Sequence, residues 1–219
     1  MFAWLTLAWL LSQRGLAQRN SSRHISPDFE EPKLLRIVVA ITGASGAIYA
    51  QRLLDNLDAR QHEVHVVISN YGQAVLAEEL TGGLRLAEGV MRHGLKSMNV
   101  PFASGSSAFD AMVVIPCSMG TLGRIAHGTS EDVLLRAADV MLKERRKLIL
   151  VPREAPLNLV HVKNFELLLQ AGATILPANP YFYSHPKTIE ELADTVVGRV
   201  LDHLGVAHRL SVRWQEEPE

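Results

Sequence analysis

Cysteine is nearly absent from the chain, because Cys117 is the single one in 219 residues. One cysteine cannot form an intrachain disulfide framework, and low cysteine use is typical of a reducing compartment, so we expect a cytoplasmic protein. An excess of one charge is also lacking, since 22 Lys and Arg stand against 23 Asp and Glu. This balance argues against nucleic acid and against an anionic membrane surface as partners.

Metal-binding spacings are lacking although the chain has nine histidines. No His-x-x-x-His pair and no Glu-flanked histidine motif occurs, so we predict no metal site. The apolar run Met1–Leu11 is too short to cross a bilayer, and no Lys or Arg precedes it as a secretory signal requires. We predict an N-terminal extension over residues 1–34, disordered or translated from an upstream start, one domain over 35–214, and a tail over 215–219.

The most informative stretch present is a short apolar strand that runs into a glycine turn, Ile37–Gly46. Apolar residues at helical spacing follow over Ala47–Leu57, so the turn opens a helix. Free N–H groups and the positive end of the helix dipole meet at such a turn, which makes it a candidate phosphate site. Gly43 and Gly46 permit close approach of the backbone, and Ser45 could cap the helix or donate to a phosphate. The alternative is a tight turn without a ligand.

Strands and helices alternate along the rest of the chain, and each predicted strand is apolar from end to end. This pattern predicts an α/β fold, a three-layer, doubly wound parallel sheet in a single domain, Rossmann-like or flavodoxin-like. We expect further strands at Glu63–Ser69, Ala111–Ile115, Lys147–Val151 and Ala173–Leu176, and a variable connection over Leu84–Val100. We expect further helices at Tyr71–Leu80, Leu122–Ala126, Ser130–Arg145, Leu157–Ala171 and Thr188–Leu204.

Two of these helices carry recognisable start signals. Ser130 is the expected N-cap of its helix, and Thr188 with Glu191 forms an expected capping box. Gly172 and Gly205 follow the last two helices as expected C-terminal glycines.

Polar residues and turns follow the expected strands, at the edge of the sheet where ligands bind in such folds. Their agreement across separate segments predicts an anion or cofactor site, although for any single segment a polar loop is the simpler reading. The residues are Gly43–Ser45, Ser69, Ser118–Thr121, Arg153, Glu154 and Tyr183.

Charged residues offer a second anion site and two proton carriers. Arg136 and Lys143 share one helix face and could hold a phosphate together with Arg153, or could form a solvated ladder with Asp139. Glu79 and Glu154 could carry protons if burial raises their pKa values, although an ordinary surface acid is the simpler reading of Glu79.

Two further chemistries are disfavoured. Cys117 has no histidine near it in sequence, so we expect a buried packing residue instead of a nucleophile. A dinucleotide site needs Gly-x-Gly-x-x-Gly and an acid after the second strand, and the chain has neither. Tyr183 and Lys187 have the spacing of a reductase pair, but Pro186 forbids a helix interior there. A mononucleotide such as FMN fits better.

Five motifs occur in a fixed order along the chain: Ala40–Ala47 (Ala-Ile-Thr-Gly-Ala-Ser-Gly-Ala), Pro101–Ser107 (Pro-Phe-Ala-Ser-Gly-Ser-Ser), Pro116–Thr121 (Pro-Cys-Ser-Met-Gly-Thr), Arg136–Arg146 (Arg-Ala-Ala-Asp-Val-Met-Leu-Lys-Glu-Arg-Arg) and Val151–Pro156 (Val-Pro-Arg-Glu-Ala-Pro). Together they resemble one family, the UbiX/Pad-type flavin prenyltransferases, once described as aromatic-acid or polyprenyl-hydroxybenzoate decarboxylases. The resemblance extends from about Arg36 to Trp214.

The resemblance implies a metal-independent transfer of a dimethylallyl group from dimethylallyl monophosphate to N5 and C6 of reduced FMN. It further implies a homo-dodecamer with sites between subunits, and delivery of prenylated FMN to a UbiD-type decarboxylase. Implied FMN contacts are Gly43, Ala44, Ser45, Ser69, Ser118, Met119, Gly120, Thr121 and Arg153. Implied contacts of the prenyl phosphate are Arg136, Lys143, Arg153, Tyr183 and Arg199, with Trp214 packing beside the substrate. Implied catalytic groups are Ser45, Glu79, Lys143 and Glu154.

Two alternatives remain open. An FMN-dependent cysteine decarboxylase of the same fold would carry Pro-Ala-Ser-Ala-Asn-Thr where this chain has Phe102–Ser107, and a Pro-x-Met-Asn motif that is absent here. A non-catalytic FMN-binding module would not need the implied set of cations around a second phosphate.

Overall fold

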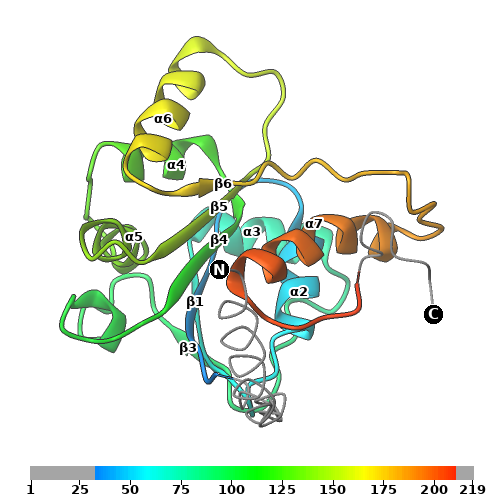
Figure 1. The fold of residues 1–219 in the computed structure, drawn as a ribbon, viewed down its shortest axis with the longest axis horizontal. Helices are drawn as coiled ribbons and strands as arrows, with labels where there is room; N and C mark the ends of the chain where they lie inside the picture. The colour runs from blue at the N-terminus through cyan, green and yellow to red at the C-terminus, as the bar shows by residue number, and fades with distance from the viewer. Residues whose placement is uncertain (1–32, 211–219) are drawn as a thin grey trace, which may run out of the picture. The chain divides into compact units, whose positions relative to one another are not determined.

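The structure is a computed structural model that describes residues 33–210. One parallel sheet of six strands, in the order β3-β2-β1-β4-β5-β6, forms its centre (Figure 1). The strands are β1 (Arg36–Ile41), β2 (Glu63–Ile68), β3 (Met91–His93), β4 (Ala111–Cys117), β5 (Lys147–Pro152) and β6 (Thr174–Ile175). This is the Rossmann strand order, so the doubly wound prediction is confirmed and the flavodoxin-like order is not the one adopted.

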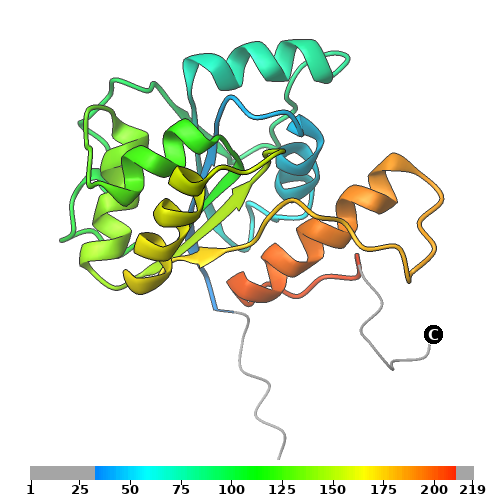
Figure 2. The ribbon, with the colours of Figure 1, turned by 90° about the horizontal axis from the view of Figure 1, so that it is seen from above.

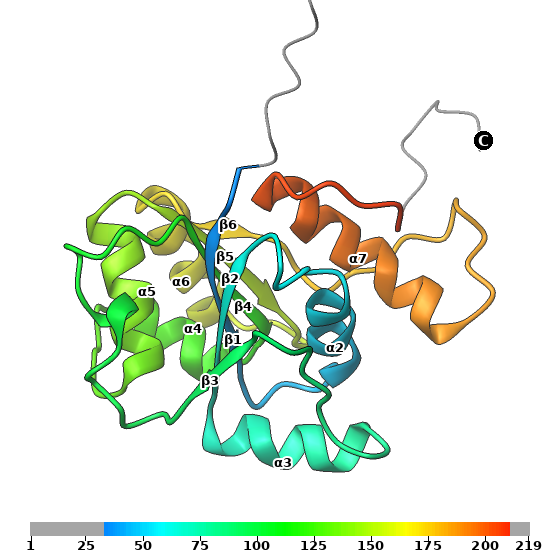
Figure 3. The ribbon, with the colours of Figure 1, turned by 90° about the horizontal axis from the view of Figure 1, so that it is seen from below.

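Helices cover both faces of the sheet, as the three-layer prediction requires (Figures 2 and 3). The helices are α2 (Ala47–Asp55), α3 (Asn70–Glu79), α4 (Met119–Ala126), α5 (Val133–Lys143), α6 (Leu159–Gln170), α7 (Ile189–Leu204) and the short 3₁₀ helix η1 (Pro101–Ala103). Helices α2, α3 and α7 pack on one face, and α4, α5, α6 and η1 pack on the other.

The central strands are apolar throughout because each contributes to two cores. In β1, Ile37, Val39 and Ile41 pack under α2 and α7, whereas Val38 and Ala40 pack under α4 and α5. All five side chains are at most 1% exposed. A strand buried on both faces reads as a continuous apolar run, and this made it recognisable in the sequence.

The strand β3 lies inside the stretch that was expected to be a variable connection, and this prediction was wrong. It is a three-residue edge strand, Met-Arg-His, with two exposed residues and one partly buried residue. An edge strand of this kind carries no apolar run, so no periodic pattern marks it.

Two predicted helix starts need correction. Helix α5 begins at Val133, and its N-cap is Asp132, whose Oδ1 accepts from Leu135 N at 2.9 Å, so Ser130 is not the cap. Thr188 does cap α7, with Oγ1 accepting from Glu191 N at 3.1 Å. Glu191 accepts instead from Lys187 N at 2.6 Å, one residue before the cap, so the reciprocal bond of a capping box is not made.

The chain ends fall outside the described residues. Residues 1–32 of the expected extension and the whole expected tail over 215–219 lie there, so the predicted domain boundaries stay predictions. Within residues 33–210 no helix is long and apolar enough to cross a membrane.

Candidate functional site

The loops that follow β1 and β4 meet between the two neighbouring strands where the strand order of the parallel sheet reverses. Thr42 is fully buried, and its Oγ1 donates to Pro116 O at 2.8 Å and accepts from Ser118 N at 2.7 Å. These bonds join the two loops across the point at which ligands bind in doubly wound sheets. Thr42 is not among the predicted site residues, although a hydroxyl residue at the end of an apolar strand was a usable signal.

The N-terminus of α2, the expected phosphate site, holds a carboxylate of the chain itself. Gly46 is the N-cap in the left-handed region at φ 116°, and no side chain of its own caps the helix. Glu79, at the end of α3, accepts through Oε2 from Gly46 N and from Ala47 N, each at 2.8 Å. Ser45 therefore does not cap α2, contrary to one expectation.

Glu79 is held in its ionised form. Burial alone would raise its pKa, but hydrogen bonds from the Ser45 hydroxyl and from the Ala47 and Gly46 amides, together with the charge of Arg153, lower the pKa overall. The expectation of a raised pKa at this residue was wrong because the sequence could not show these donors. A carboxylate with a lowered pKa accepts hydrogen bonds and can take up a proton, but it is a poor proton donor at neutral pH.

Two glycines allow α3 to approach the end of β1. A Cβ atom on Gly43 would stand 2.4 Å from Cβ of Tyr71, and one on Gly72 would stand 2.6 Å from the carbonyl oxygen of Ile41. Any larger side chain would push the helix away. The close approach sets the position of Ser69, whose Oγ caps α3 by accepting from Gly72 N at 3.0 Å.

The N-terminus of α4 is open to a ligand. Ser118 caps it, with Oγ accepting from Thr121 N at 3.3 Å and donating to Thr121 Oγ1 at 3.1 Å. Gly120 is exposed, and no atom lies within 4 Å of the place a Cβ would occupy. Since the first N–H groups of a helix have no partner within it, Met119 and Gly120 present donors at this end.

Arg153 and Glu154 follow β5 at the same edge of the sheet. Both are exposed, so the expected partial burial of Glu154 does not occur within one chain. Glu154 Oε1 accepts a hydrogen bond from Ala155 N at 3.1 Å. The two residues line a cavity of about 260 Å³ together with Phe165 of α6 and residues 177–179. Tyr49 of α2, a residue the sequence analysis missed, lies near Arg153; burial raises the pKa of its hydroxyl, and the charge of Arg153 opposes that rise.

Arg136 and Lys143 of α5 do not reach this edge. Arg136 donates to Ala103 O at 3.0 Å and to Asp139 Oδ2 at 2.7 Å, and Lys143 pairs with Glu144. The loop beside them leads to Ser107, which accepts from Arg36 at the start of β1. Lys143 therefore lies toward the amino ends of the strands, far along α5 from the loops described above.

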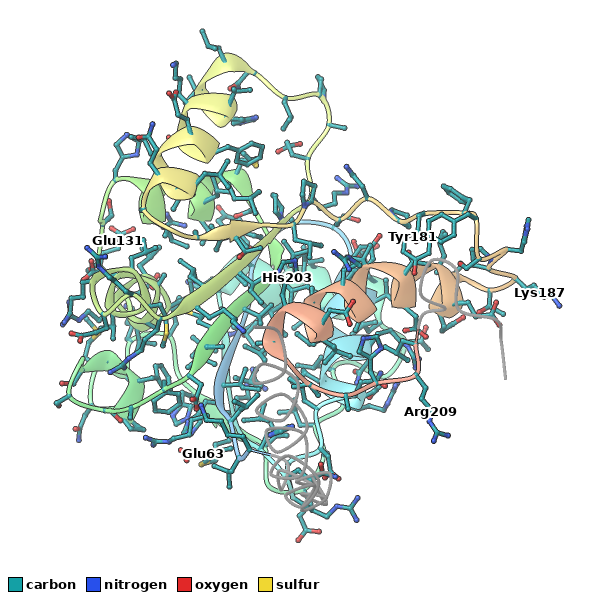
Figure 4. All side chains as sticks on the ribbon, in the orientation of Figure 1. Glu63, Glu131, Tyr181, Lys187, His203 and Arg209 are labelled. Atoms are coloured by element: carbon teal, nitrogen blue, oxygen red, sulfur yellow. The ribbon has the colours of Figure 1, made fainter. Side chains whose placement is uncertain are left out.

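Tyr183 lies on the segment before α7 and Arg199 lies on α7, which packs on the opposite face of the sheet from α5. Tyr183 is 53% exposed on the segment before α7. Arg199 is exposed on α7 and donates to Asp202 Oδ2 at 3.3 Å. The end of α7 lies near the start of β5, where Lys147 donates to His203 O (Figure 4). Trp214 lies outside the described residues.

Cys117 is fully buried, which confirms the expectation of a packing residue. Burial raises the pKa of its thiol to about 12, so the reactive thiolate is scarce. Among residues 33–210, no group of three or more His, Cys, Asp and Glu is placed to hold a metal ion.

Comparison with known proteins places these residues in a family. The family model described as Flavoprotein matches residues 26–201. The flavin prenyltransferase UbiX of Halalkalibacterium halodurans is 48% identical over 191 residues, which cover 82% of this chain and 93% of that protein. The enzyme of the same name from Pseudomonas aeruginosa is 46% identical over 198 residues, covering 83% and 95%.

Solved structures agree with these relatives. AnUbiX in complex with FMN and dimethylallyl pyrophosphate superposes with a TM-score of 0.79 at 40% identity, covering 85% of this chain and 100% of that one. A mutant phosphopantothenoylcysteine (PPC) decarboxylase reaches a TM-score of 0.55 at 20% identity, which shows a shared fold alone. The chain therefore belongs to the UbiX flavin prenyltransferase family.

Proposed function

We propose that this chain is a flavin prenyltransferase that moves a dimethylallyl group from dimethylallyl monophosphate to N5 and C6 of reduced FMN. The observation that carries the proposal is the cluster of Ser45, Glu79 and Arg153 at the carboxyl edge of the sheet, in a member of the UbiX family. A relative with 40% identity, AnUbiX, is described in complex with FMN and dimethylallyl pyrophosphate, the two kinds of molecule that this reaction joins.

The residues at the carboxyl edge fit FMN. The N-terminus of α4 has N–H donors and open space at Gly120, so a phosphate can bind there. At the N-terminus of α2, the Glu79 carboxylate already accepts from the amides. When bound, reduced FMN supplies the N5 and C6 atoms that receive the dimethylallyl group. The residues proposed to hold it are Gly43, Ala44, Ser45, Ser69, Ser118, Met119, Gly120, Thr121 and Arg153.

Ser45 and Glu79 form the proposed proton path. The Ser45 hydroxyl donates to the Glu79 carboxylate, whose lowered pKa keeps it ionised and therefore able to accept hydrogen bonds. Glu154, the residue after Arg153, is the second proposed proton carrier. Together these groups can receive the proton that a flavin ring position must lose when a carbon bond forms there.

The leaving phosphate needs cations and hydrogen-bond donors, and the residues proposed to bind it are dispersed within one chain. Arg136 and Lys143 lie on α5, and Tyr183 and Arg199 lie on the other face of the sheet. Loss of phosphate from an allylic carbon develops negative charge on oxygen, which fixed Arg and Lys side chains stabilise. Residues from several copies of the chain, with Arg153 and Trp214, would supply one complete set.

A homo-dodecamer with sites between subunits satisfies this requirement. A UbiX-like decarboxylase from Escherichia coli O157:H7, 39% identical with a TM-score of 0.79, is described as dodecameric and FMN-dependent. Helix α6 leaves Leu159, Val160 and Leu169 between 56% and 72% exposed, and apolar side chains so exposed are typical of a contact surface. We further propose a cytoplasmic location and a UbiD-type decarboxylase as the recipient of the prenylated FMN.

The test incubates the purified full chain with FMN, dimethylallyl monophosphate and dithionite without oxygen, and weighs the released flavin by mass spectrometry. A flavin heavier by one C5H8 unit supports the proposal. The Glu79→Gln variant should lose that product, whereas the matched Glu78→Gln variant, at the neighbouring exposed acid, should keep it. Bound FMN without a mass gain would favour the cysteine-decarboxylase or non-catalytic alternatives, and absence of bound FMN would refute all three.

A further inference from the structure

Two tyrosine rings stack on the segment between β6 and α7. The ring centroids of Tyr181 and Tyr183 lie 4.2 Å apart, and the ring planes differ by 6°. Figure 4 shows Tyr181 on this segment, which continues outward to Lys187 before α7 begins. Tyr183 is a proposed contact of the substrate phosphate, and Tyr181 is its stacking partner.

The segment is fastened to the body of the protein up to Tyr181. Ala178 N donates to Pro152 O at 2.9 Å, and Tyr181 N donates to Thr195 Oγ1 at 3.3 Å. Thr195 is buried in α7 and donates in turn to Leu192 O at 2.7 Å. The backbone of Tyr181 is therefore fixed to a helix of the core.

Beyond Tyr181 the chain turns outward. His185 N donates to Phe182 O at 2.9 Å, and His185 itself adopts a left-handed φ of 53°. Tyr183 thus lies two residues beyond the bond to Thr195, within a turn. Its ring orientation depends on what the ring contacts, and the stacked partner is Tyr181.

Burial alone does not fix the ring of Tyr183, because 53% of the residue stays exposed. The observed contact between the two tyrosines is the ring stack, while Phe182 between them is 68% exposed. What the stack does accomplish is to hold the ring of Tyr183 in one plane.

We propose that Tyr181 is a positioning residue, whose ring presets Tyr183 so that the Tyr183 hydroxyl meets the phosphate of dimethylallyl monophosphate without further ordering. This inference rests on the proposed function, in which Tyr183 binds that phosphate. A side chain that is ordered before binding loses less conformational freedom when the ligand arrives. The effect of Tyr181 therefore falls on substrate affinity more than on the chemical step.

The first experiment compares three variants of the full chain with FMN and dimethylallyl monophosphate. Tyr181→Ala should raise KM about 3- to 10-fold, the value of one aromatic pair, with kcat changed less than KM. Tyr181→Phe keeps the ring and should restore the KM of the original chain. Phe182→Ala is the matched control, because it removes a neighbouring exposed ring without touching the stack, and it should leave KM unchanged.

A double-mutant cycle then tests whether Tyr181 acts through Tyr183. In a Tyr183→Ala background, Tyr181→Ala should add no further rise in KM, because the ring it would position is gone. An independent, multiplied loss would overturn the proposal. So would an unchanged KM in Tyr181→Ala, or a Tyr181→Phe variant as impaired as Tyr181→Ala.

A binding measurement separates this inference from the proposed function. Calorimetric titration of dimethylallyl monophosphate into the protein loaded with oxidised FMN involves no turnover, and Tyr181→Ala should weaken binding by the same factor as KM. If the original chain binds and prenylates normally while Tyr181→Ala binds equally well, the positioning role alone fails. If the original chain neither binds dimethylallyl monophosphate nor prenylates FMN, both proposals fail.

Discussion

The two ends of the sheet use the same kinds of polar residue in opposite ways. At the amino ends, Arg36 Nε and Nη2 donate to the two Glu63 carboxylate oxygens at 2.7 and 3.0 Å. Glu63 Oε1 also lies 2.8 Å from His65 Nε2, and His65 Nδ1 lies 2.8 Å from His93 Nε2. Glu63 stands at the start of β2 in Figure 4. Four charged or titratable side chains thus satisfy one another in a continuous chain.

Aromatic rings enclose this network. The ring of His65 meets Phe102 and Phe109 edge to face, with centroids 5.5 and 5.0 Å away, and the Arg36 guanidinium lies 4.2 Å above the Phe109 ring. Within the described residues, no buried side-chain nitrogen or oxygen lacks a hydrogen-bond partner. A polar network satisfied in this way rigidifies the structure around it.

At the carboxyl ends, Arg153 and Glu154 are exposed and the first turn of α4 faces open space. The difference shows how to separate stability from function here. Polar groups that bond to partners inside the chain stabilise the fold, and those exposed at the carboxyl ends are available to bind a ligand or another subunit. Four predictions test this contrast.

The largest effect is expected from Arg153→Ala. Loss of a fixed cation at developing negative charge should lower the prenylation rate by about 100-fold or more, with little change in the free energy of unfolding because the side chain is exposed. Single-turnover kinetics and urea unfolding measure the two quantities. Arg60→Ala, an exposed arginine that pairs with Asp58 in the loop before β2, is the control and should keep its rate. A large fall in the free energy of unfolding of Arg153→Ala would contradict the proposed difference between the two ends of the sheet.

The second effect belongs to the amino ends. His65→Leu removes both hydrogen bonds of a side chain that is 2% exposed and leaves Glu63 and His93 without this partner. We expect the free energy of unfolding to fall by about 1–3 kcal/mol, with FMN affinity unchanged. His203→Leu, at an exposed histidine near the end of α7, should change stability by less than about 0.5 kcal/mol. Weakened FMN binding in His65→Leu would show that the two ends are coupled.

A smaller effect distinguishes two roles of one serine. Ser69→Ala removes the N-cap of α3 and should lower stability by about 1 kcal/mol in the FMN-free protein. If Ser69 also contacts FMN, saturating FMN should widen the gap between the original chain and the variant. Thr188→Ala, which removes the cap of α7 far from the proposed flavin contacts, should show the same gap with and without FMN.

The smallest effect is a dependence of stability on pH. Burial, and next the charge of His65, lower the pKa of His93, so the unfolded chain takes up a proton more readily than the native protein. The contribution of neutral His93 to the free energy of unfolding is therefore complete above the unfolded pKa of about 6.5 and is lost as the pH falls below it. His93→Gln should flatten the unfolding free energy measured across this range. The pKa of Glu63 is lowered to about 2, chiefly by the hydrogen bond from Arg36. Its contribution to the free energy of unfolding is therefore complete above its ordinary pKa of 4.5 and is lost as the pH falls below that value.

Much of the fold could be predicted because the apolar pattern and the capping residues are local. The strands β1, β4 and β5 are nearly continuous apolar runs, but β3 is three exposed or half-exposed residues that pair only with β2. Ser130 and Asp132 are both good caps, and only the first helical residue, Val133, decides between them. Choices of this kind depend on the loop geometry, which no short stretch of sequence specifies.

The candidate site could be predicted only as a set of residues. Motifs placed Ser45, Ser118 and Arg153 at one edge, because the carboxyl ends of parallel strands must meet there. They could not show that Lys143 and Arg199 lie on different faces, since each was read from its own helix. Nor could they show that Glu79 reaches the start of α2, because that contact joins residues 33 positions apart in sequence.

Glu79 therefore behaves as a tethered anion in a site that would otherwise attract free ones. Its effective concentration at the α2 amides is set by the folded chain that positions α3 beside α2, and tethered groups of this kind reach the millimolar range or above. Monovalent ions from solution must compete against that concentration with fewer contacts. With the start of α2 occupied in this way, the N-terminus of α4, where Ser118 is the cap, is the helix start left to a ligand phosphate.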